Sequence, residues 1–597
     1  MKADVQKVTQ AIAERSRESR AAYLDLMQQT QAKSPAKSCL SCSNVAHVIA
    51  ASPDDEKQAI PSSKSVNIGI VTAYNDMLSA HQPLATYPDF IKAKARELGA
   101  TAQVAGGVPA MCDGVTQGMP GMELSLFSRD VIAMATAVSL THNVFDAVAC
   151  LGVCDKIVPG MLIGALQFGH LPAVFIPAGP MTSGISNPEK ARIRQQYAAG
   201  EVDELALLDV ETRSYHSAGT CTFYGTANAN QLLMEMLGVQ LPSTSFINTG
   251  TPLRDKLTAA SIERAVAMAE RNVGLAQVVS EKSMVNAIVG LLATGGSTNH
   301  TLHLLAIARS AGINVTWGDI DQLSRVVPLL ARVYPNGTAD VNHMRDAGGI
   351  AFLVHELRRG GLLHDGLPNI MGEGLDPYVC EPEAKGEGLG WSAPVAASRN
   401  AEVLRPVDEP FDAEGGIQLL QGNLGQAVVK VSAVDKEYRA IKAPCKIFSS
   451  QKAMQDAFAN DELSRDVVVV VRFQGPSANG MPELHKLTPA LAVLQDRGFK
   501  VALLTDGRMS GASGKVLAAI HVTPEAIRGG VIGKLRDGDI VSIDANTGVF
   551  NVELSDAELA QRSSAKAPVE PQTLGRSLFS SFKSHVSGAE IGAEVLF

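Results

Sequence analysis

Apolar residues along this chain form two kinds of segment, which follow one another in turn. Short runs of aliphatic and β-branched residues have the length of buried strands, and the segments between them carry apolar residues at helical spacing. We predict strands at 66–74, 101–105, 144–151 and 171–176. We predict helices at 3–26, 83–98, 130–140, 161–168, 230–237, 258–271, 285–292 and 301–310. Strands that alternate with helices indicate crossover units and a largely parallel sheet.

The pattern changes in the last third of the chain. Residues 373–410 are rich in Gly and Pro and hold few apolar clusters, so we place the main boundary there. Beyond it we predict β-rich segments at 467–472, 500–505 and 540–551 and a helix at 482–495. We therefore expect an α/β protein with a large N-terminal parallel-sheet domain over 1–390 and a smaller β-rich α/β domain over 391–597.

Composition and charge narrow the class of protein. A chain of 597 residues is too long for one core, and 46% hydrophobic with 19% charged residues is ordinary for a compact protein in water. The net charge of −9 argues against nucleic-acid binding, and an anionic substrate would have to meet locally clustered cations or a metal. Residues 1–20 hold no signal-peptide core, no apolar run could span a bilayer, and eight cysteines are too sparse for a disulfide framework. We therefore expect a cytoplasmic protein that does not bind membranes.

Polar motifs repeatedly follow the predicted strands. Cys154 comes shortly after the run at 144–151, and Pro177-Ala178-Gly179-Pro180 follows the run at 171–176. In the second domain, Asp506-Gly507-Arg508 follows another β-rich run. Because ligands of open α/β sheets bind beyond the carboxyl ends of the strands, these motifs predict a functional site at those ends.

Cys154-Asp155-Lys156 is the most informative of these motifs. Soft thiolates select iron–sulfur clusters, zinc or copper(I), whereas hard carboxylates select magnesium-like ions. The plain alternative is a buried cysteine that packs as a small hydrophobe, which suits Cys150 inside its strand. It does not suit Cys154, because the charges beside it need solvent, a partner or a metal. Together with Cys221, in a segment containing Gly and Asn, the motif predicts metal-assisted chemistry on an oxygen-rich substrate.

The remaining motifs are weaker by themselves. Cys112-Asp113 suits a turn at least as well as a pair of metal ligands, and the Cys39–Cys42 pair has no second pair nearby. Glu483 follows a proline, so the start of a helix explains both residues without any function. The loops around Ser510 and at 295–300 are rich in Gly and Ser, and their amides could hold a phosphate.

Taken together, these segments resemble the dehydratase family that includes dihydroxy-acid dehydratase and 6-phosphogluconate dehydratase. The resemblance extends from about residue 66 to the C-terminal end of the chain. It rests jointly on Cys112-Asp113-Gly114, Cys154–Gly160, the Cys221 segment, Gly480-Met481-Pro482-Glu483 and Thr505–Gly511. Three segments are similar to the 6-phosphogluconate branch in particular, namely Ala73–Pro83, Tyr215–Gly225 and Pro482–Pro489.

The resemblance implies a fold and an activity. The C-terminal domain should be β-barrel-like, the active site should lie between the two domains, and the protein should be a homodimer. The implied activity is that of a hydro-lyase of the Entner–Doudoroff pathway. It would convert the phosphorylated sugar acid 6-phospho-D-gluconate to 2-dehydro-3-deoxy-6-phospho-D-gluconate and water.

The resemblance also implies a 4Fe–4S cluster as cofactor. Cys154 and Cys221 match cysteine ligands of the family. Another cluster cysteine of the dihydroxy-acid branch falls at Ala80 in this chain, so the third ligand here is Cys112 or, failing that, His81.

A second metal and a base are implied by the same resemblance. Asp113, Asp155 and Glu483 match the family's ligands for Mg²⁺, and Lys156 matches a lysine beside that metal which can be carbamylated in the family. Ser510 matches the proposed base, an alkoxide that removes the C2 proton.

Several alternatives stay open at this point. A dihydroxy-acid or aldonate dehydratase of the same family would act on unphosphorylated acids. A dinucleotide-dependent oxidoreductase fits the crossover units, but we find no G-x-G-x-x-G that opens a helix after a strand. A metal-storage protein would bind metal without removing water from any acid. For the phosphate, our candidate contacts are Arg508, Lys515 and the 295–300 loop.

Overall fold

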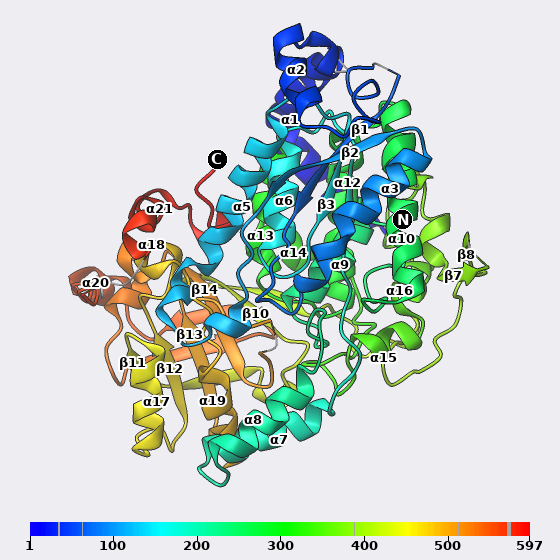
Figure 1. Ribbon diagram of the computed structural model, residues 1–597. Helices are drawn as coiled ribbons and strands as arrows, with labels where there is room; N and C mark the ends of the chain where they lie inside the picture. Colours follow the sequence, from blue (N-terminus) through cyan, green and yellow to red (C-terminus); the bar gives the residue numbers. More distant parts are fainter. Residues whose placement is uncertain (34–35, 63, 387, 512, 570–574) are drawn as a thin grey trace.

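The N-terminal part of the protein is built on a four-stranded parallel sheet (Figure 1). The computed structural model describes residues 1–33, 36–62, 64–386, 388–511, 513–569 and 575–597. The strands lie in the order β2-β1-β3-β4 and span Thr101–Gly107, Asn67–Thr72, Ala147–Leu151 and Ala173–Ile176. All four predicted strands are confirmed.

Helices cover both faces of this sheet. The helices α5 (Ser125–Leu140) and α6 (Ile157–Leu166) pack against each other on one side, and α3 (Tyr87–Glu97) and α10 (Pro252–Glu270) lie on the other (Figure 1). Every residue of β3 and β4 is consequently buried, which explains why these strands are continuous apolar runs and do not alternate with polar residues.

The strand order changes direction between the two central strands of the sheet. The chain goes from β1 outward to β2, then returns to β3 on the other side of β1 and continues to β4. The connections therefore diverge between β1 and β3, and ligands of such sheets bind beyond the carboxyl ends of the strands at this point. The loops after β2 and β3 carry Cys112 and Cys154.

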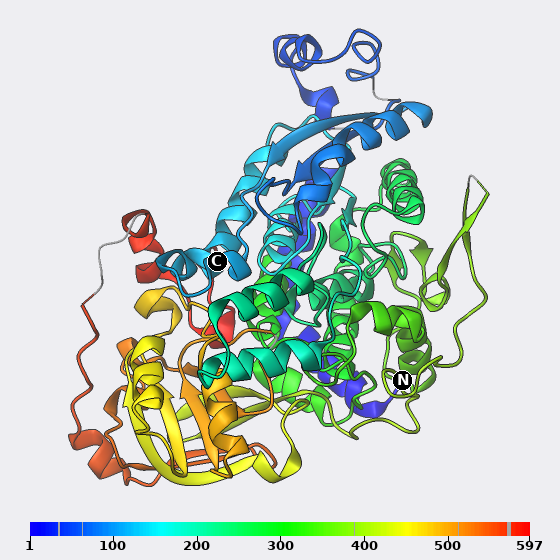
Figure 2. The same ribbon diagram turned by 60° about the horizontal axis from the view of Figure 1, so that its bottom comes forward.

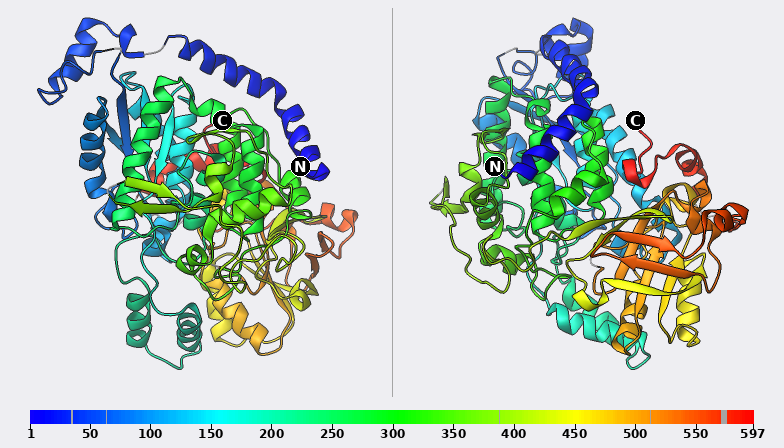
Figure 3. Two further views of the ribbon diagram at one scale, coloured as in Figure 1. Left: turned by 90° about the vertical axis from the view of Figure 1, so that its right-hand side faces the viewer. Right: turned by 180° about the vertical axis from the view of Figure 1, so that it is seen from behind.

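Further helices complete the N-terminal part. The helix predicted at 3–26 is α1 (Ala3–Gln31), which lies along the outside of the molecule (Figure 3). Three more predicted helices are confirmed as α9 (Thr226–Leu237), α12 (Glu281–Ala293) and α13 (His300–Ser310). The sequence pattern missed a hairpin of two helices, α7 (Asn187–Ala198) and α8 (Glu204–Ser214), which reaches toward the C-terminal part of the chain (Figure 2). Within the described part of the chain, no helix combines the length and apolar character needed to cross a bilayer.

The C-terminal part contains a closed barrel of eight strands (Figures 1 and 3). Its strands are β9 Ile417–Gly422, β10 Gly425–Lys430, β11 Ala440–Phe448, β12 Val467–Val471, β13 Val501–Thr505, β14 Leu517–Thr523, β15 Ile540–Asp544 and β16 Val549–Val552. Strands β11 to β14 are parallel, and residues such as Val429, Val468 and Leu504 form a second core. The predicted barrel-like domain is confirmed.

One predicted helix in this part begins later than expected. The helix predicted at 482–495 is α19, which spans Leu487–Asp496. Gly480 and Met481 have positive φ values of 79° and 56°, and Glu483 lies in an isolated β-bridge with Arg508, four residues before the helix begins. The interpretation of Glu483 as the start of a helix is therefore wrong.

Candidate active site

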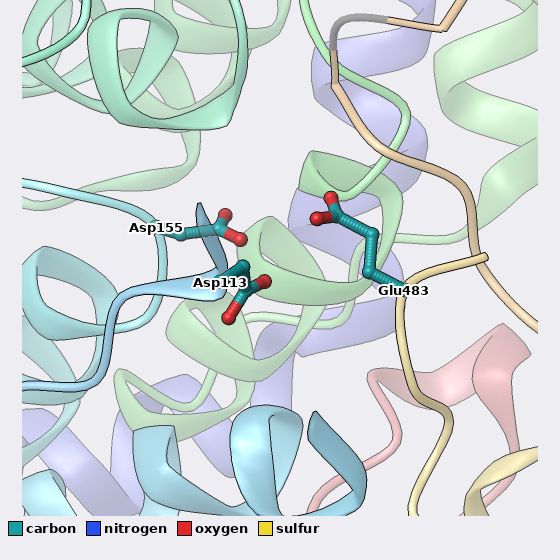
Figure 4. A group of neighbouring side chains, drawn as sticks. All are labelled: Asp113, Asp155 and Glu483. Carbon is teal, nitrogen blue, oxygen red and sulfur yellow. The ribbon is translucent and has the colours of Figure 1, made fainter. Parts of the chain in front are cut away.

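Three carboxylates from the two parts of the chain meet in one cluster (Figure 4). Asp113 begins the short helix α4 (Asp113–Thr116) after β2, and Asp155 lies in the loop between β3 and α6. Glu483 comes from the loop before α19 and is 6% exposed. Their ligand oxygens all lie within 4.8 Å of one another, a spacing that suits one hard cation with oxygen ligands.

Two buried cations stand among these carboxylates. The Nζ of Lys156 contacts Asp113 and lies 2.6 Å from Oδ2 of Asp155. The guanidinium of Arg508 lies 3.1 Å from Asp113, 3.7 Å from Asp155 and 3.6 Å from Glu483. Arg508, one of our candidates for the phosphate, therefore contacts all three carboxylates. With all three carboxylates ionised, two cations leave one negative charge for a bound metal to neutralise.

The loop of Glu483 is fixed directly to the loop of Arg508. Glu483 and Arg508 form an isolated parallel β-bridge, in which the amide of Leu484 donates to the carbonyl of Arg508 at 3.0 Å. The Nε of Arg508 in turn donates to the carbonyl of Met481 at 2.9 Å. The left-handed turn at Gly480 and Met481 thus replaces a helix start and aims Glu483 at the N-terminal carboxylates.

The electrostatic environment separates the proton affinities of these carboxyl groups. Burial, and then the charge of Asp113, raise the pKa of Glu483 to about 7. Burial opposes ionisation of Asp155 as well, but Lys156, His303 and Arg508 outweigh it and hold the pKa of Asp155 well below its usual range. Burial also lowers the pKa of His303 to about 4, so its imidazole is neutral beside Asp155. Perturbed groups concentrated in this way are typical of functional sites.

Three thiols lie beside the carboxylates. Burial, followed by the proximity of Cys112 and Cys221, raises the pKa of Cys154 well above its ordinary value. Burial and then Cys112 raise the pKa of Cys221 to about 12. The three sulfurs are thus neighbours, and they form a set of three soft donors of the kind that iron–sulfur clusters and zinc both use.

The helix α9 holds both cysteine-bearing loops. From its first turns, Nδ2 of Asn228 donates to the carbonyl of Cys221 at 2.7 Å, and Nδ2 of Asn230 donates to the carbonyls of Cys154 at 2.9 Å and of Asp155 at 2.8 Å. Cys154 has a left-handed backbone with φ 72°, which a residue other than glycine rarely adopts. In the sequence, Asn228 stands out only as part of the Cys221 segment and Asn230 only as the start of a predicted helix, so neither was predicted to hold a cysteine-bearing loop.

Ser510 lies in the loop between β13 and β14, two residues after Arg508. A Cβ added to the next residue, Gly511, would come within 2.9 Å of the side chains of Thr226 and Ser297, so only glycine allows this close approach to α9. Lys515, the other basic candidate in this loop, pairs with Asp496 instead.

The other candidate ligands lie in different surroundings. His81 is fully buried, and burial lowers its pKa to about 4. Cys39 and Cys42 are exposed near the N-terminus, whereas Cys150 and Cys445 are buried in the two cores.

The fold and this centre together define a class: two-part α/β proteins in which a parallel sheet and a barrel bring carboxylates and thiols together in one centre. Comparison with known families makes the assignment specific. Residues 65–378 match the model of the dihydroxy-acid/6-phosphogluconate dehydratase N-terminal domain, and residues 402–593 match that of the C-terminal domain. The chain belongs to the dihydroxy-acid/6-phosphogluconate dehydratase family.

Individual relatives agree with this assignment. A phosphogluconate dehydratase of Pseudomonas aeruginosa is 56% identical, covering 99% of this chain and 98% of the relative. The phosphogluconate dehydratase of Escherichia coli K12 is 53% identical, covering 98% of each chain. A dihydroxy-acid dehydratase of Caldanaerobacter subterraneus is 34% identical, covering 85% of this chain and 89% of the relative.

Proposed function

We propose that this protein is a phosphogluconate dehydratase, the hydro-lyase that converts 6-phospho-D-gluconate to 2-dehydro-3-deoxy-6-phospho-D-gluconate and water in the Entner–Doudoroff pathway. One observation carries the proposal. Three thiols and three carboxylates converge in one buried centre, in a chain similar over nearly its whole length to phosphogluconate dehydratases. We further propose that it works as a cytoplasmic homodimer, with its two domains divided at residue 390.

The donor sets fit the cofactors of the family. Cys112, Cys154 and Cys221 offer thiolates, which are the donors of 4Fe–4S clusters, and three protein ligands would leave one iron open. When bound, such a cluster supplies a Lewis acid for the departing C3 hydroxyl. Cys112 is preferred over His81 as the third ligand because its thiol interacts electrostatically with both other cysteines. Asp113, Asp155 and Glu483 would hold Mg²⁺ through oxygen atoms alone.

The residues around these donor sets account for binding and proton transfer. Lys156 and Arg508 place fixed positive charge where the substrate's carboxylate and C2 oxygen gain negative charge, and burial keeps water from screening them. Ser510, two residues from Arg508, would remove the C2 proton as an alkoxide. Its hydroxyl can ionise only if nearby positive charge lowers its pKa, and the cations of this centre provide such charge. Loss of the C3 hydroxyl then leaves an enol, which tautomerises to the 2-keto acid.

An anaerobic preparation tests this proposal. Iron and sulfide would be counted and an optical spectrum recorded, and 2-keto-acid formation would then be measured with 6-phosphogluconate, gluconate and a branched dihydroxy acid. We expect cluster absorption and a strong preference for 6-phosphogluconate, with turnover at least 100-fold lower in Ser510→Ala at unchanged iron content. Full turnover by iron-free protein would contradict the proposal. A preference for an unphosphorylated acid would mean that the protein is a dihydroxy-acid or aldonate dehydratase of the same family.

A further inference from the structure

A small cavity lies beside Ser510 on the outer face of the barrel. Its volume is about 30 Å³, and one side is lined by apolar residues of β13, β14 and α19. The polar side chains that line it are Thr298, Lys430, Thr488, Ser510 and Ser513. A water-sized group needs roughly 10–15 Å³ by this measure, so the cavity has room for two or three such groups. The three terminal oxygens of a phosphoryl group need comparable space.

Lys430 is the unusual member of this lining. It is the last residue of β10, its Nζ is buried, and among the described residues it has no hydrogen-bond partner and no ion pair. Burial lowers its pKa to about 7. Because a buried ammonium group without a counter-ion is costly, an unpaired one is evidence for a ligand that completes it.

Five basic residues near the site have acidic partners. Lys156 and Arg508 contact the carboxylate cluster, and Lys515 contacts Asp496. On α7, Lys190 and Arg194 share Glu211 at 3.5 and 2.5 Å. Lys430 therefore differs from all of these cations in having no carboxylate to neutralise it among the residues that the structure describes.

We propose that this cavity binds the phosphate of the substrate, a phosphate monoester dianion, with Lys430 as its counter-ion and Thr298 and Ser513 as hydroxyl donors. The inference rests on the proposed function and names the subsite that makes it specific for a phosphorylated acid.

The order of residues along one loop supports this placement. Ser510 is two residues from Arg508, a span of at most about 7 Å of chain, and it lines the cavity together with Ser513 and Gly514. A six-carbon phosphorylated acid carries its carboxylate and its phosphate at opposite ends. A substrate lying along this loop presents its carboxylate near Arg508, its C2 near Ser510 and its phosphate near Lys430.

Substrate discrimination in Lys430 variants tests the inference. The quantity to measure is the ratio of kcat/KM for 6-phosphogluconate to kcat/KM for gluconate, in the cluster-loaded enzyme. We expect Lys430→Met to lower this ratio at least tenfold, mainly through a higher KM for the phosphorylated acid, and Lys430→Arg to restore part of it. Thr298→Val should lower the ratio about threefold. Lys446→Met is the matched control, because this lysine of β11 pairs with Asp537 on the barrel surface and should leave the ratio unchanged.

A second measurement does not depend on turnover. Inorganic phosphate titrated into the folded wild-type protein should give a binding signal by calorimetry, and Lys430→Met should weaken it at least tenfold. If Lys430→Met changes neither the ratio nor the phosphate binding, the inference is wrong. An equal loss of kcat for both acids would also overturn it, because Lys430 would then assist proton transfer by Ser510 and would not bind the phosphate. Wild-type protein that dehydrates neither acid would instead overturn the proposed function.

Discussion

At the scale of single residues, two asparagines of α9 hold the loops that carry the candidate cluster ligands. Asn228 and Asn230 bind carbonyls of the loops that present Cys221 and Cys154, so one rigid helix sets the relative position of two thiols. Neither asparagine donates to a thiol, and each acts through the backbone of the loop that it holds. Groups that orient metal ligands in this way commonly affect metal affinity 10- to 100-fold.

We expect Asn228→Ala and Asn230→Ala to lower the iron content of the purified protein and to speed loss of iron to a chelator by roughly tenfold. Each substitution also removes buried hydrogen bonds, at a cost of about 1–3 kcal/mol in unfolding free energy. Asn286→Ala is the matched control, because Asn286 is equally buried and makes two bonds to the backbone of His364, away from the site. Equal iron retention in all three variants would show that the asparagines of α9 serve stability alone.

At the scale of elements, the hairpin of α7 and α8 is held together by a few charges. Glu211 on α8 pairs with both Lys190 and Arg194 on α7, and the hairpin exposes Leu205 and Leu208. On α8, Val210 is buried, but Leu205 and Leu208 are exposed beside the charged side chains of Asp209 and Arg213. The helix therefore has no clear apolar stripe, and the sequence pattern does not predict it.

Glu211→Ala should open the hairpin locally and leave the rest of the fold intact. The pairs are partly exposed, so we expect a loss of about 1 kcal/mol, or roughly a fivefold higher population of the open hairpin. Limited proteolysis between residues 187 and 214 should accelerate by that factor, with the midpoint of thermal unfolding nearly unchanged. Asp209→Ala, which removes a more exposed pair with Arg213, should change neither. Cooperative destabilisation of the whole protein by Glu211→Ala would contradict this picture.

At the scale of the whole molecule, the C-terminal tail returns to the N-terminal part (Figure 1). The fully buried Arg129 of α5 donates to the carbonyls of Gly592 and Ala593 at 3.0 and 2.9 Å. Its neighbour Asp130 accepts from the amide of Val595 at 2.9 Å. The tail thus joins the end of the barrel domain to a helix that packs on the parallel sheet.

Deletion of residues 588–597 should destabilise the protein by at least about 3 kcal/mol. Arg129 and Asp130 would lose three hydrogen bonds to the backbone, and each buried group left without a partner costs about 1–3 kcal/mol. Urea unfolding of the metal-free protein measures this change. Lys452→Ala is the control, because it removes only an exposed pair with Asp456 and should cost about 1 kcal/mol or less. A deletion no more costly than Lys452→Ala would mean that the tail does not join the two parts.

Much of the fold is determined by local patterns in the sequence. The four strands of the sheet, β12, β13 and most long helices are visible because their periodicity reflects burial of one segment at a time. The sequence also shows that Cys154 and Asp506 follow strands. Because such sheets bind ligands at the carboxyl ends of their strands, this position predicted a functional site there. The resemblance of these motifs to one dehydratase family was visible at the same level.

Only the tertiary structure decided which of these motifs meet. Asp113 and Glu483 are separated by several hundred residues, and their contact depends on how the barrel docks onto the sheet, which no local pattern encodes. Arg508 was one of three candidates for the phosphate, and the structure shows it paired with the carboxylates beside the bridge to Glu483. Lys430 belongs to no motif at all. The role proposed for it rests on a buried Nζ that has no hydrogen-bond partner among the described residues, and burial is a property of the folded chain and not of the sequence around it.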